Sequence, residues 1–419
     1  MTLLTTKTLW LPALAMAVSA TATQFLFAPV NRALDSNGMG EWNPWYAPVV
    51  PQRNFSRPDE VGANLPGAVT GTAEPAAAEA ADHAGIWERM RSGFRLVPAA
   101  TSPVQSHLKR FHRYPHHVER LLQRGEPYLY YILSSLEERG LPAELALLPV
   151  IESAFDPFAV SPAGAAGIWQ FMPVTAQHTG LRQDWWYDGR RDIVAATEAA
   201  LDYLAELRQR FDGDWLLALA AYNAGSAKVN QAIRYNRSEG KLIDFWHLPL
   251  PRETRDYVPK LLALQAIIRD PAAHGITLPR LANADYFSIV DTGGQIDLRV
   301  AARLAGSTVE EMQRLNPGLT RSITPPASQH TLVIPRASER RFRERLALLP
   351  PEQRVQAVKY RIRWGDTLST IALGYRTTVA RLLQANRLDS TVIYAGKLII
   401  VPMGEAAEDA GGELHAALM

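Results

Sequence analysis

The chain has 419 residues, enough for two or three domains, with a balanced charge of 44 basic and 42 acidic side chains. This balance indicates no polyanion-binding surface, and we expect no nucleic-acid partner. The absence of cysteine excludes disulfides, a cysteine nucleophile, zinc–thiolate sites and a lipid anchor of the bacterial lipoprotein type.

The first 22 residues are predicted to form a signal peptide. Lys7 precedes a short apolar run, and Ala20-Thr21-Ala22 fits the small-residue pattern of a cleavage site. The apolar run is short for a membrane span, so we expect export to the periplasm, with an uncleaved membrane anchor as the alternative. Residues 23–84 are rich in Pro, Ala and Gly and are predicted to be a flexible spacer.

Residues 85–278 are predicted to form an all-helical domain. Apolar residues recur every three or four positions in "VERLLQRGEPYLYYILSSLEERG" and "DIVAATEAALDYLAELRQRF", as they do on the buried face of an amphipathic helix. The stretch "DWLLALAAYNAG" is typical of a short buried helix closed by Gly225, a normal C-cap residue. The segment "ETRDYVPKLLALQAII" supplies another helix.

The stretch "LPAELALLPVIESAF" contains a carboxylate in an unusual position. It is predicted to be an apolar helix starting at Pro142, with Leu145, Leu148 and Glu152 on one stripe. Burial on such a stripe would raise the pKa of the acid, which suits a general acid near neutral pH. Pairing with an arginine, or a place at the frayed helix end, explains Glu152 equally well from this helix alone.

Residues 284–336 and 357–403 are predicted to be two copies of a strand–helix–helix–strand unit. Identical residues recur at an offset of 70 positions: Asn316 and Asn386, Thr308 and Thr378, Leu298 and Leu368. Residues 337–356 are expected to form a charged connecting helix, and residues 404–419 a disordered tail. The predicted fold class is therefore multidomain, with an all-α domain followed by two small α+β units of βααβ type.

Two segments after Glu152 combine polar groups with large side chains. A loop of small residues, "SPAGAAG", leads into "IWQFMP". Aromatic and amide side chains next to an acid on an apolar helix face indicate more than packing of the core. The sequence "AYNAG" puts Tyr222 and Asn223 at the end of a buried helix. Taken alone, Tyr222 could be a core tyrosine and Asn223 a helix cap.

Other chemically suggestive residues are interpreted as structural. His112, His116 and His117 lack the H-E-x-x-H pattern of a zinc site, and no metal or cofactor is expected. Asp156, in "FDPF", is the nearest second carboxylate, but this sequence is typical of a helix-ending turn. The basic run "ERRFRERL" is interpreted as a solvated helix face.

The ordered set "ES", "GIWQFMP", "AYNAG" and "ETRDYVPK" resembles the soluble lytic transglycosylase domain. This goose-lysozyme-like family (glycoside hydrolase family 23) cleaves peptidoglycan. The segments "EPYLYYI" and "ELALLPVIESAFDPFA" are similar to its membrane-bound D-type members, and "VKYRIRWGDTLSTIA" with "GKLIIVP" resembles a LysM domain. The resemblance covers nearly all of residues 86–403 and implies a lysozyme-like catalytic domain followed by LysM-type domains.

The resemblance also implies roles for individual residues. Glu152 matches the single catalytic acid of the family. The residues that match substrate-contacting positions are Ser161, Gln170, Met172, Tyr222, Asn223 and Tyr257. Ile168-Trp169 stands where many members have Leu-Met, but D-type members carry Trp there.

The family's chemistry needs only one carboxylate. Protonated Glu152 would donate to the glycosidic oxygen between MurNAc and GlcNAc, and the N-acetyl group would stabilise the oxocarbenium-like centre. Ionised Glu152 would then take the proton of the sugar's C6 hydroxyl, leaving a 1,6-anhydro end. The alternatives are a muramidase on the same scaffold and a non-catalytic wall-binding protein. The expected partner is the peptidoglycan glycan strand.

The second βααβ unit carries the expected glycan contacts. Asp366 is predicted to cap the first helix, which Thr367 and Leu368 begin. LysM domains bind N-acetylglucosamine chains beside two loops, and the resemblance assigns these loops to Gly365–Leu368 and Ile393–Gly396.

The first βααβ unit departs from this pattern. Gln295 and Ile296 stand where the second unit has Gly365 and Asp366. We expect the first unit to keep the fold and leave its glycan binding open. Tethered weak sites would raise the local concentration of glycan at the catalytic domain.

Overall fold

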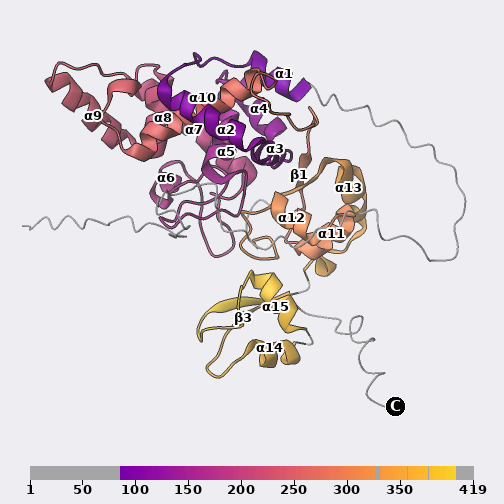
Figure 1. Cartoon of the computed structure of the whole chain (residues 1–419). Helices are drawn as coiled ribbons and strands as arrows, with labels where there is room; N and C mark the ends of the chain where they lie inside the picture. Colours follow the sequence, from indigo (N-terminus) through magenta and orange to yellow (C-terminus); the bar gives the residue numbers. More distant parts are fainter. Residues whose placement is uncertain (1–84, 326–330, 356, 376, 403–419) are drawn as a thin grey trace, which may run out of the picture. The chain divides into compact units, whose positions relative to one another are not determined.

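The structure is a computed structural model that describes residues 85–325, 331–355, 357–375 and 377–402. The predicted signal peptide, spacer and tail lie outside the described residues. The helical domain (Figure 1) consists of α1 (Gly85–Ser92), α2 (Ser102–Arg113), α3 (Pro115–Gln123), α4 (Leu129–Glu138), the 3₁₀ helix η2 (Ala143–Leu147), α5 (Leu148–Ser153), α6 (Pro173–His178), α7 (Ile193–Arg210), α8 (Trp215–Ala224), α9 (Ser226–Ser238), η3 (Phe245–His247) and α10 (Arg252–Arg269).

Local capping sets the starts of α7 and α8. The Asp192 side chain accepts from the Ala195 amide at the start of α7, and Asp214 accepts from two amides at the start of α8. Both are standard N-cap interactions. Gly225 closes α8 with a φ of 86°, which confirms its predicted place as C-cap.

Helix α10 passes through the core of the helical domain. It contacts α2, α5 and α8, and most of its residues are buried, including Tyr257 and Lys260. Pro259 lies inside the helix and removes one backbone donor there. The segment "DYVPK" therefore has one backbone hydrogen bond fewer than a regular helix, and its buried residues pack it into the core.

The segment that carries Glu152 is not the single helix predicted from Pro142. Pro142 is extended, with a ψ of 132°, and residues 143–147 form the 3₁₀ helix η2 before α5 begins at Leu148. Pro149 explains the break, because it lacks the N–H needed to continue an α-helical ladder. Leu145 and Leu148 are fully buried, as expected for the apolar stripe.

A second carboxylate, Glu144, holds η2 against the rest of the domain. Its Oε1 accepts from the backbone amides of Arg95 and Leu96 and from Nε2 of Gln265 on α10, at 2.8, 2.7 and 2.6 Å. Glu144 is fully buried, so these bonds compensate for the lost hydration of its oxygen.

The two βααβ units each form a two-stranded antiparallel sheet. The first consists of β1 (Phe287–Asp291), α11 (Leu298–Ala305), α12 (Val309–Leu315) and β2 (Thr331–Pro335). The second consists of β3 (Ala357–Arg361), α14 (Leu368–Gly374), α15 (Val379–Asn386) and β4 (Leu398–Pro402). The predicted fold class is confirmed.

The repeated residues have the same structural roles in both units. Nδ2 of Asn316 donates to the Val333 carbonyl and its Oδ1 accepts from the Val333 amide, at 2.7 and 2.8 Å. Asn386 makes the same pair of bonds with Ile400, both at 2.7 Å. Each asparagine therefore joins its second helix to the last strand of its unit.

The predicted cap of α14 is wrong by one residue. Thr367 is the N-cap and forms a capping box with Thr370. Asp366 instead accepts from the Arg363 amide at 2.6 Å and from the Tyr360 hydroxyl at 2.8 Å. The shorter threonine reaches the helix amides, which leaves the carboxylate to brace the preceding turn.

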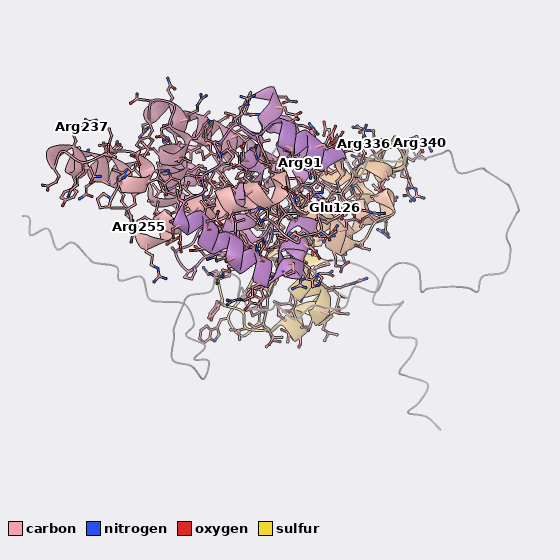
Figure 2. All side chains as sticks on the ribbon, turned by 45° about the horizontal axis from the view of Figure 1, so that its top comes forward. Arg91, Glu126, Arg237, Arg255, Arg336 and Arg340 are labelled. Carbon is pink, nitrogen blue, oxygen red and sulfur yellow. The ribbon has the colours of Figure 1, made fainter. Side chains whose placement is uncertain are left out.

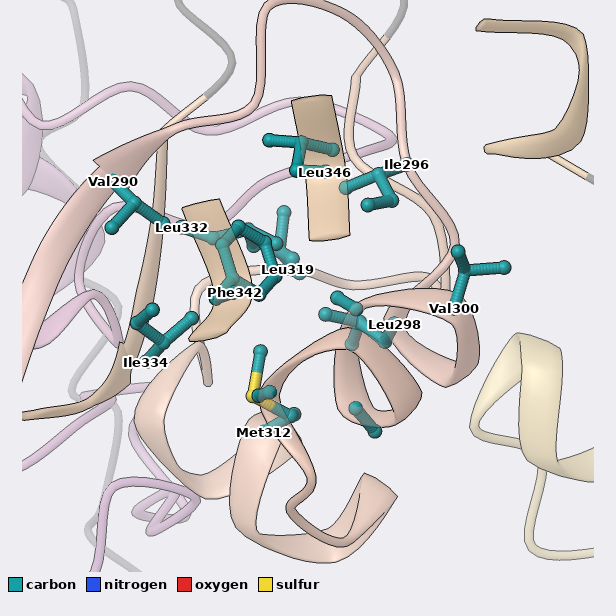
Figure 3. Packing of buried hydrophobic residues seen from close by; sticks show 13 residues of the cluster. Val290, Ile296, Leu298, Val300, Met312, Leu319, Leu332, Ile334, Phe342 and Leu346 are labelled. Carbon is teal, nitrogen blue, oxygen red and sulfur yellow. The ribbon is translucent and has the colours of Figure 1, made fainter. Parts of the chain in front are cut away.

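Figure 3 shows the apolar core of the first unit, which includes Val290, Leu298, Met312 and Ile334. Phe342 and Leu346 belong to the same core, and both lie on α13 (Glu339–Leu348). The helix expected as a connector, flanked by η4 (Arg336–Ser338) and η5 (Pro351–Gln353), therefore also packs as part of the first unit.

The described surface is rich in charged side chains, as Figure 2 illustrates with Arg237 on α9, Arg255 on α10 and Arg340 on α13. Arg340 is 91% exposed, as predicted for the outer face of "ERRFRERL". Among the described residues, none of the helices combines the length and apolarity needed to cross a membrane.

Candidate active site

The carboxyl group of Glu152 contacts a tyrosine from the far end of the helical domain's sequence. Glu152 is the penultimate residue of α5, and Tyr257 lies on α10. The Tyr257 hydroxyl donates to Oε1 of Glu152 at 2.6 Å. Tyr257 is 4% exposed, whereas Glu152 is half-buried, so the acid keeps some access to solvent.

The surroundings of Glu152 raise its pKa, so that the carboxyl group is partly protonated near neutral pH. Burial raises the pKa of Glu152 to about 7, although the hydrogen bond from Tyr257 and the charge of Lys260 act in the opposite direction. The nearby charge of Glu253 adds to the upward shift. Burial is the main cause, as the position of Glu152 on an apolar stripe predicted.

A second tyrosine links α8 to the loop that follows α5. The Tyr222 hydroxyl donates to the Trp169 carbonyl at 2.9 Å. Burial and the charge of Glu152 raise the pKa of Tyr222 well above its usual range. Tyr222 is therefore a neutral hydrogen-bond donor beside the acid, and it also has the structural role that the sequence left open.

The loop between α5 and α6 is tied to the end of α5 by one side-chain bond and is braced by others within itself. Oγ of Ser153 donates to the Ile168 carbonyl at 3.0 Å, and Nε2 of Gln170 donates to the Gly167 carbonyl at 2.8 Å. Oγ of Ser161 accepts from the Ala165 amide at 3.0 Å. Met172, at the start of α6, is 40% exposed, so its side chain is accessible.

Three of the described non-glycine residues with positive φ closely follow Glu152 in the sequence, two of them directly at the end of α5 and one on the next loop. Ala154, Phe155 and Gln170 have φ values of 55°, 57° and 51°, in the left-handed region that non-glycine residues avoid. Each such residue costs about 1–2 kcal/mol. Strain of this kind persists where the surrounding structure overdetermines the backbone, and it is common at functional sites.

The remaining predicted residues have structural partners. Oδ1 of Asn223 accepts from the Thr254 hydroxyl at 2.8 Å, so it joins α8 to α10. Asp156 accepts from the Phe158 amide at 2.9 Å, which confirms its interpretation as a turn residue. His112 contacts His274 at 3.0 Å, and His116 contacts Glu119 at 2.9 Å.

The two loops assigned to glycan binding in the second βααβ unit lie side by side. The Gly396 amide donates to the Ile362 carbonyl at 2.7 Å, next to the Gly365 turn. Gly365 and Gly396 have φ values of 87° and 84°, which explains glycine at both turns. Leu368 is 2% exposed and Ile393 packs against the same core, so both residues support the loops from within the unit.

The corresponding loop of the first unit is bonded to the segment before β2. Ile296 is fully buried, and its amide donates to Oγ1 of Thr324 at 2.9 Å. Nε2 of Gln295 donates to the Thr324 carbonyl at 2.7 Å. The two residues that depart from the pattern of the second unit are therefore used to tie two segments of the first unit together.

Sequence reasoning missed one charged residue at the acid. Lys260 is 9% exposed and lies one helical turn after Tyr257. Burial lowers the pKa of Lys260 to about 8, while the charge of Glu152 raises it. Its position three residues after the tyrosine in "YVPK" was an available signal, because residues at i and i+3 share a helix face.

Comparison with known families agrees with this architecture. Residues 130–245 match the Transglycosylase SLT domain. Residues 286–350 match the LysM-like domain described for the lytic transglycosylase MltD, and residues 360–402 match the LysM domain.

Individual proteins are similar to the whole or to a part of the chain. Membrane-bound lytic murein transglycosylase D of Escherichia coli (strain K12) is 34% identical over 333 residues, covering 77% of this chain and 74% of that protein. A putative soluble lytic murein transglycosylase of Haemophilus influenzae is 32% identical over 148 residues, covering 34% of this chain and 25% of that protein. The solved 70 kDa soluble lytic transglycosylase of Escherichia coli has 30% identity, a TM-score of 0.25, and covers 31% of this chain and 22% of that chain.

A helical SLT domain joined to LysM-type units defines an enzyme of the lytic murein transglycosylase class. Since the match to the D-type protein extends over both parts, the chain belongs to the family of membrane-bound lytic murein transglycosylase D. The resemblance seen in the sequence motifs is thereby confirmed.

Proposed function

We propose that the chain cleaves the β-1,4 bond between MurNAc and GlcNAc in peptidoglycan and leaves a 1,6-anhydro-MurNAc end. The observation that carries the proposal is the state of Glu152. Its pKa of about 7 allows it to donate a proton at neutral pH and to accept one afterwards, which is the requirement for one group to serve as acid and then base.

The proposed steps use one carboxyl group. Glu152 transfers its proton to the glycosidic oxygen as the bond from C1 to that oxygen breaks, and the GlcNAc side departs with a new hydroxyl. The N-acetyl group of MurNAc stabilises the positive charge at C1. The C6 hydroxyl oxygen then bonds to C1 and returns its proton to Glu152. Tyr257, through its hydrogen bond, stabilises the carboxylate between the two transfers.

The other predicted residues are proposed to hold the sugar. Met172 is supported by its exposure, and Gln170 by its place on the loop tied to α5. Tyr222 is proposed to act beside the acid, since the charge of Glu152 acts on its hydroxyl. Ser161 and Asn223 already bond within the domain and are proposed to shape the site.

Mass spectrometry of fragments released from purified sacculi tests the proposal. We expect products one water lighter than those of hydrolysis. Products with free reducing ends would make the chain a muramidase instead. A hydrolase needs a second group to position water. Glu253 would then be the candidate, because it is an exposed carboxylate whose charge acts on Glu152.

The pH dependence of cleavage is expected to respond to Lys260. Glu152 acts first as a protonated acid, so kcat/KM should fall as the pH rises through about 7. Because the charge of Lys260 lowers the pKa of Glu152, Lys260→Met should move this fall to higher pH. The measurement is kcat/KM on soluble glycan fragments from pH 5 to 9, in steps of about half a unit.

A matched control for this profile is Lys228→Met, which removes an exposed lysine from α9. In this variant, kcat/KM should fall at the same pH as in the unaltered chain. If kcat/KM of Lys260→Met also fell at that pH, the electrostatic coupling of Lys260 to Glu152 would be contradicted.

We further propose that the second βααβ unit binds the glycan strand beside the loops Gly365–Leu368 and Ile393–Gly396. Trp364 is 95% exposed next to Gly365 and offers a flat aromatic face. Trp364→Ala is expected to weaken binding to insoluble sacculi by about fivefold, with cleavage of soluble fragments unchanged. Leu373→Ala, which truncates an 83% exposed side chain of the same unit, is the control for binding in a pelleting assay.

We propose a periplasmic location, following the predicted signal peptide of residues 1–22. The Escherichia coli relative is described as membrane-bound, which supports a place in the cell envelope. An uncleaved N-terminal anchor would be equally consistent with that description.

A further inference from the structure

Three arginines come together from the three parts of the described chain. Arg191 precedes α7 in the helical domain, Arg321 lies between α12 and β2 of the first βααβ unit, and Arg387 is the C-cap of α15 in the second. The charges of both Arg191 and Arg321 act on Arg387. We propose that Arg191, Arg321 and Arg387 form a binding site for an oxyanion, a carboxylate or a phosphate.

Each guanidinium has a buried nitrogen without a hydrogen-bond acceptor. These atoms are Nε of Arg191, Nε of Arg321 and Nη2 of Arg387. A buried donor without a partner costs about 1–3 kcal/mol, and more when it is charged. Three such donors in one cluster are best explained by an external acceptor with several oxygen atoms.

The described partners of the three arginines supply little negative charge. Oδ2 of Asp188 is 3.9 Å from Nε of Arg191, too far for a hydrogen bond, and the same carboxylate already accepts from Arg190 at 2.8 and 2.9 Å. Nη1 of Arg387 donates to the Pro317 carbonyl at 3.4 Å, and Nη1 of Arg321 to the adjacent Thr320 carbonyl at 2.7 Å.

The two neighbouring arginines disfavour the charge of Arg387. Burial, together with the charges of Arg191 and Arg321, lowers the pKa of Arg387 to about 10. Arginine prefers planar, two-pronged recognition of carboxylate and phosphate, and such charge-assisted bonds are about twice as strong as neutral ones. An oxyanion would therefore relieve the repulsion and satisfy the free N–H groups together.

Aromatic rings hold two of the guanidinium groups in place. Arg321 lies 4.3 Å from the centroid of the Trp185 ring, and Arg387 lies 5.4 Å from that of Phe158. Lys359 adds a further positive charge at 5.0 Å from the Trp185 ring. These cation–π contacts reduce the freedom of the donors before a ligand arrives.

The position of the cluster suggests two sources for the anion. Phe158 follows Glu152 by six residues on the loop after α5, so a substrate bound at Glu152 could extend toward the arginines. One source is a carboxylate of the peptide stem, a possibility that rests on the proposed function. The other is free inorganic phosphate, which does not depend on that function.

The test is calorimetric titration of the full chain with inorganic phosphate, and separately with a soluble stem peptide carrying free carboxylates, at constant ionic strength. We expect saturable binding of one or both probes. Arg387→Met and Arg321→Met should each weaken it by at least about tenfold. Arg340→Met, which removes a 91% exposed arginine on α13, should leave it unchanged.

Circular dichroism spectra would establish that each variant is folded, and Arg387→Lys, which keeps the charge, provides a milder second variant that should bind less tightly. Phosphate binding alone would assign the site to free phosphate, and peptide binding would assign it to the stem. Absence of binding by either probe, or equal weakening in Arg340→Met, would overturn the proposal. Binding is measured without any bond cleavage, so failure of the proposed reaction would not affect the test of the anion site.

Discussion

Glu152→Gln is expected to reduce cleavage of peptidoglycan by about 10³-fold or more, while the helical domain stays folded. The amide has the same shape as the acid and can still accept the hydrogen bond from Tyr257, but it cannot donate a proton to the glycosidic oxygen or take one from the C6 hydroxyl. The measurement is the amount of soluble muropeptide released from sacculi per unit time, quantified by mass spectrometry.

The matched control is Glu144→Gln, the same exchange at a buried carboxyl eight positions earlier in the sequence. Glu144 uses Oε1 for its three bonds, and Oε2 has no partner, so an amide oxygen can replace the bonded atom. We expect some loss of stability but activity within about threefold of the unaltered chain. Retained activity in Glu152→Gln, or an equal loss in Glu144→Gln, would contradict the assignment of Glu152 as the catalytic acid.

The repeat architecture was predictable because its signals are local. The offset of 70 positions between Asn316 and Asn386 identified two copies of one unit, and the structure gives both asparagines the same pair of bonds to a strand. An asparagine side chain can satisfy a strand's amide and carbonyl at once, which explains why both units have this residue at the same position.

The partners of Glu152 were less accessible to sequence reasoning. Tyr257 lies 105 positions away, and periodicity carries no information about which distant helix covers a carboxylate. Family resemblance supplied the tyrosine as a substrate-contacting residue, whereas its direct bond to the acid came from the structure. Lys260 shares the helix face of Tyr257 but was missed, because a lysine in an apolar helix is usually read as surface.

The strained backbone could not be read from the sequence at all. Ala154, Phe155 and Gln170 adopt left-handed φ values that their residue types disfavour, so propensity points away from the observed structure. The arginine cluster is similar, because Arg191, Arg321 and Arg387 come from three separate units and only tertiary contacts unite them. Both features depend on packing that no local pattern encodes.

Gly167 provides a direct test of how tightly the loop beside Glu152 must pack. Gly167 has a φ of 80° and lies against the residues that precede α7, where an added Cβ would be 2.0 Å from the Arg190 carbonyl oxygen. Gly164, on the same loop, has a φ of 87°, but its Cβ would meet nothing closer than Pro173 at 3.9 Å. The two glycines therefore share the dihedral requirement and differ in available space.

Gly167→Ala is expected to lower the free energy of unfolding of the helical domain by about 3–5 kcal/mol, combining left-handed strain with displacement of backbone. Gly164→Ala should lose only about 1–2 kcal/mol, from strain alone. Because the carbonyl of Gly167 also accepts from Gln170, a shift of this turn should move Gln170 and reduce cleavage by about 10–100-fold. Urea unfolding and muropeptide release, measured on both variants, separate the two contributions. Equal effects in the two alanine variants would mean that the dihedral angle, rather than contact with the Arg190 backbone, requires glycine at position 167.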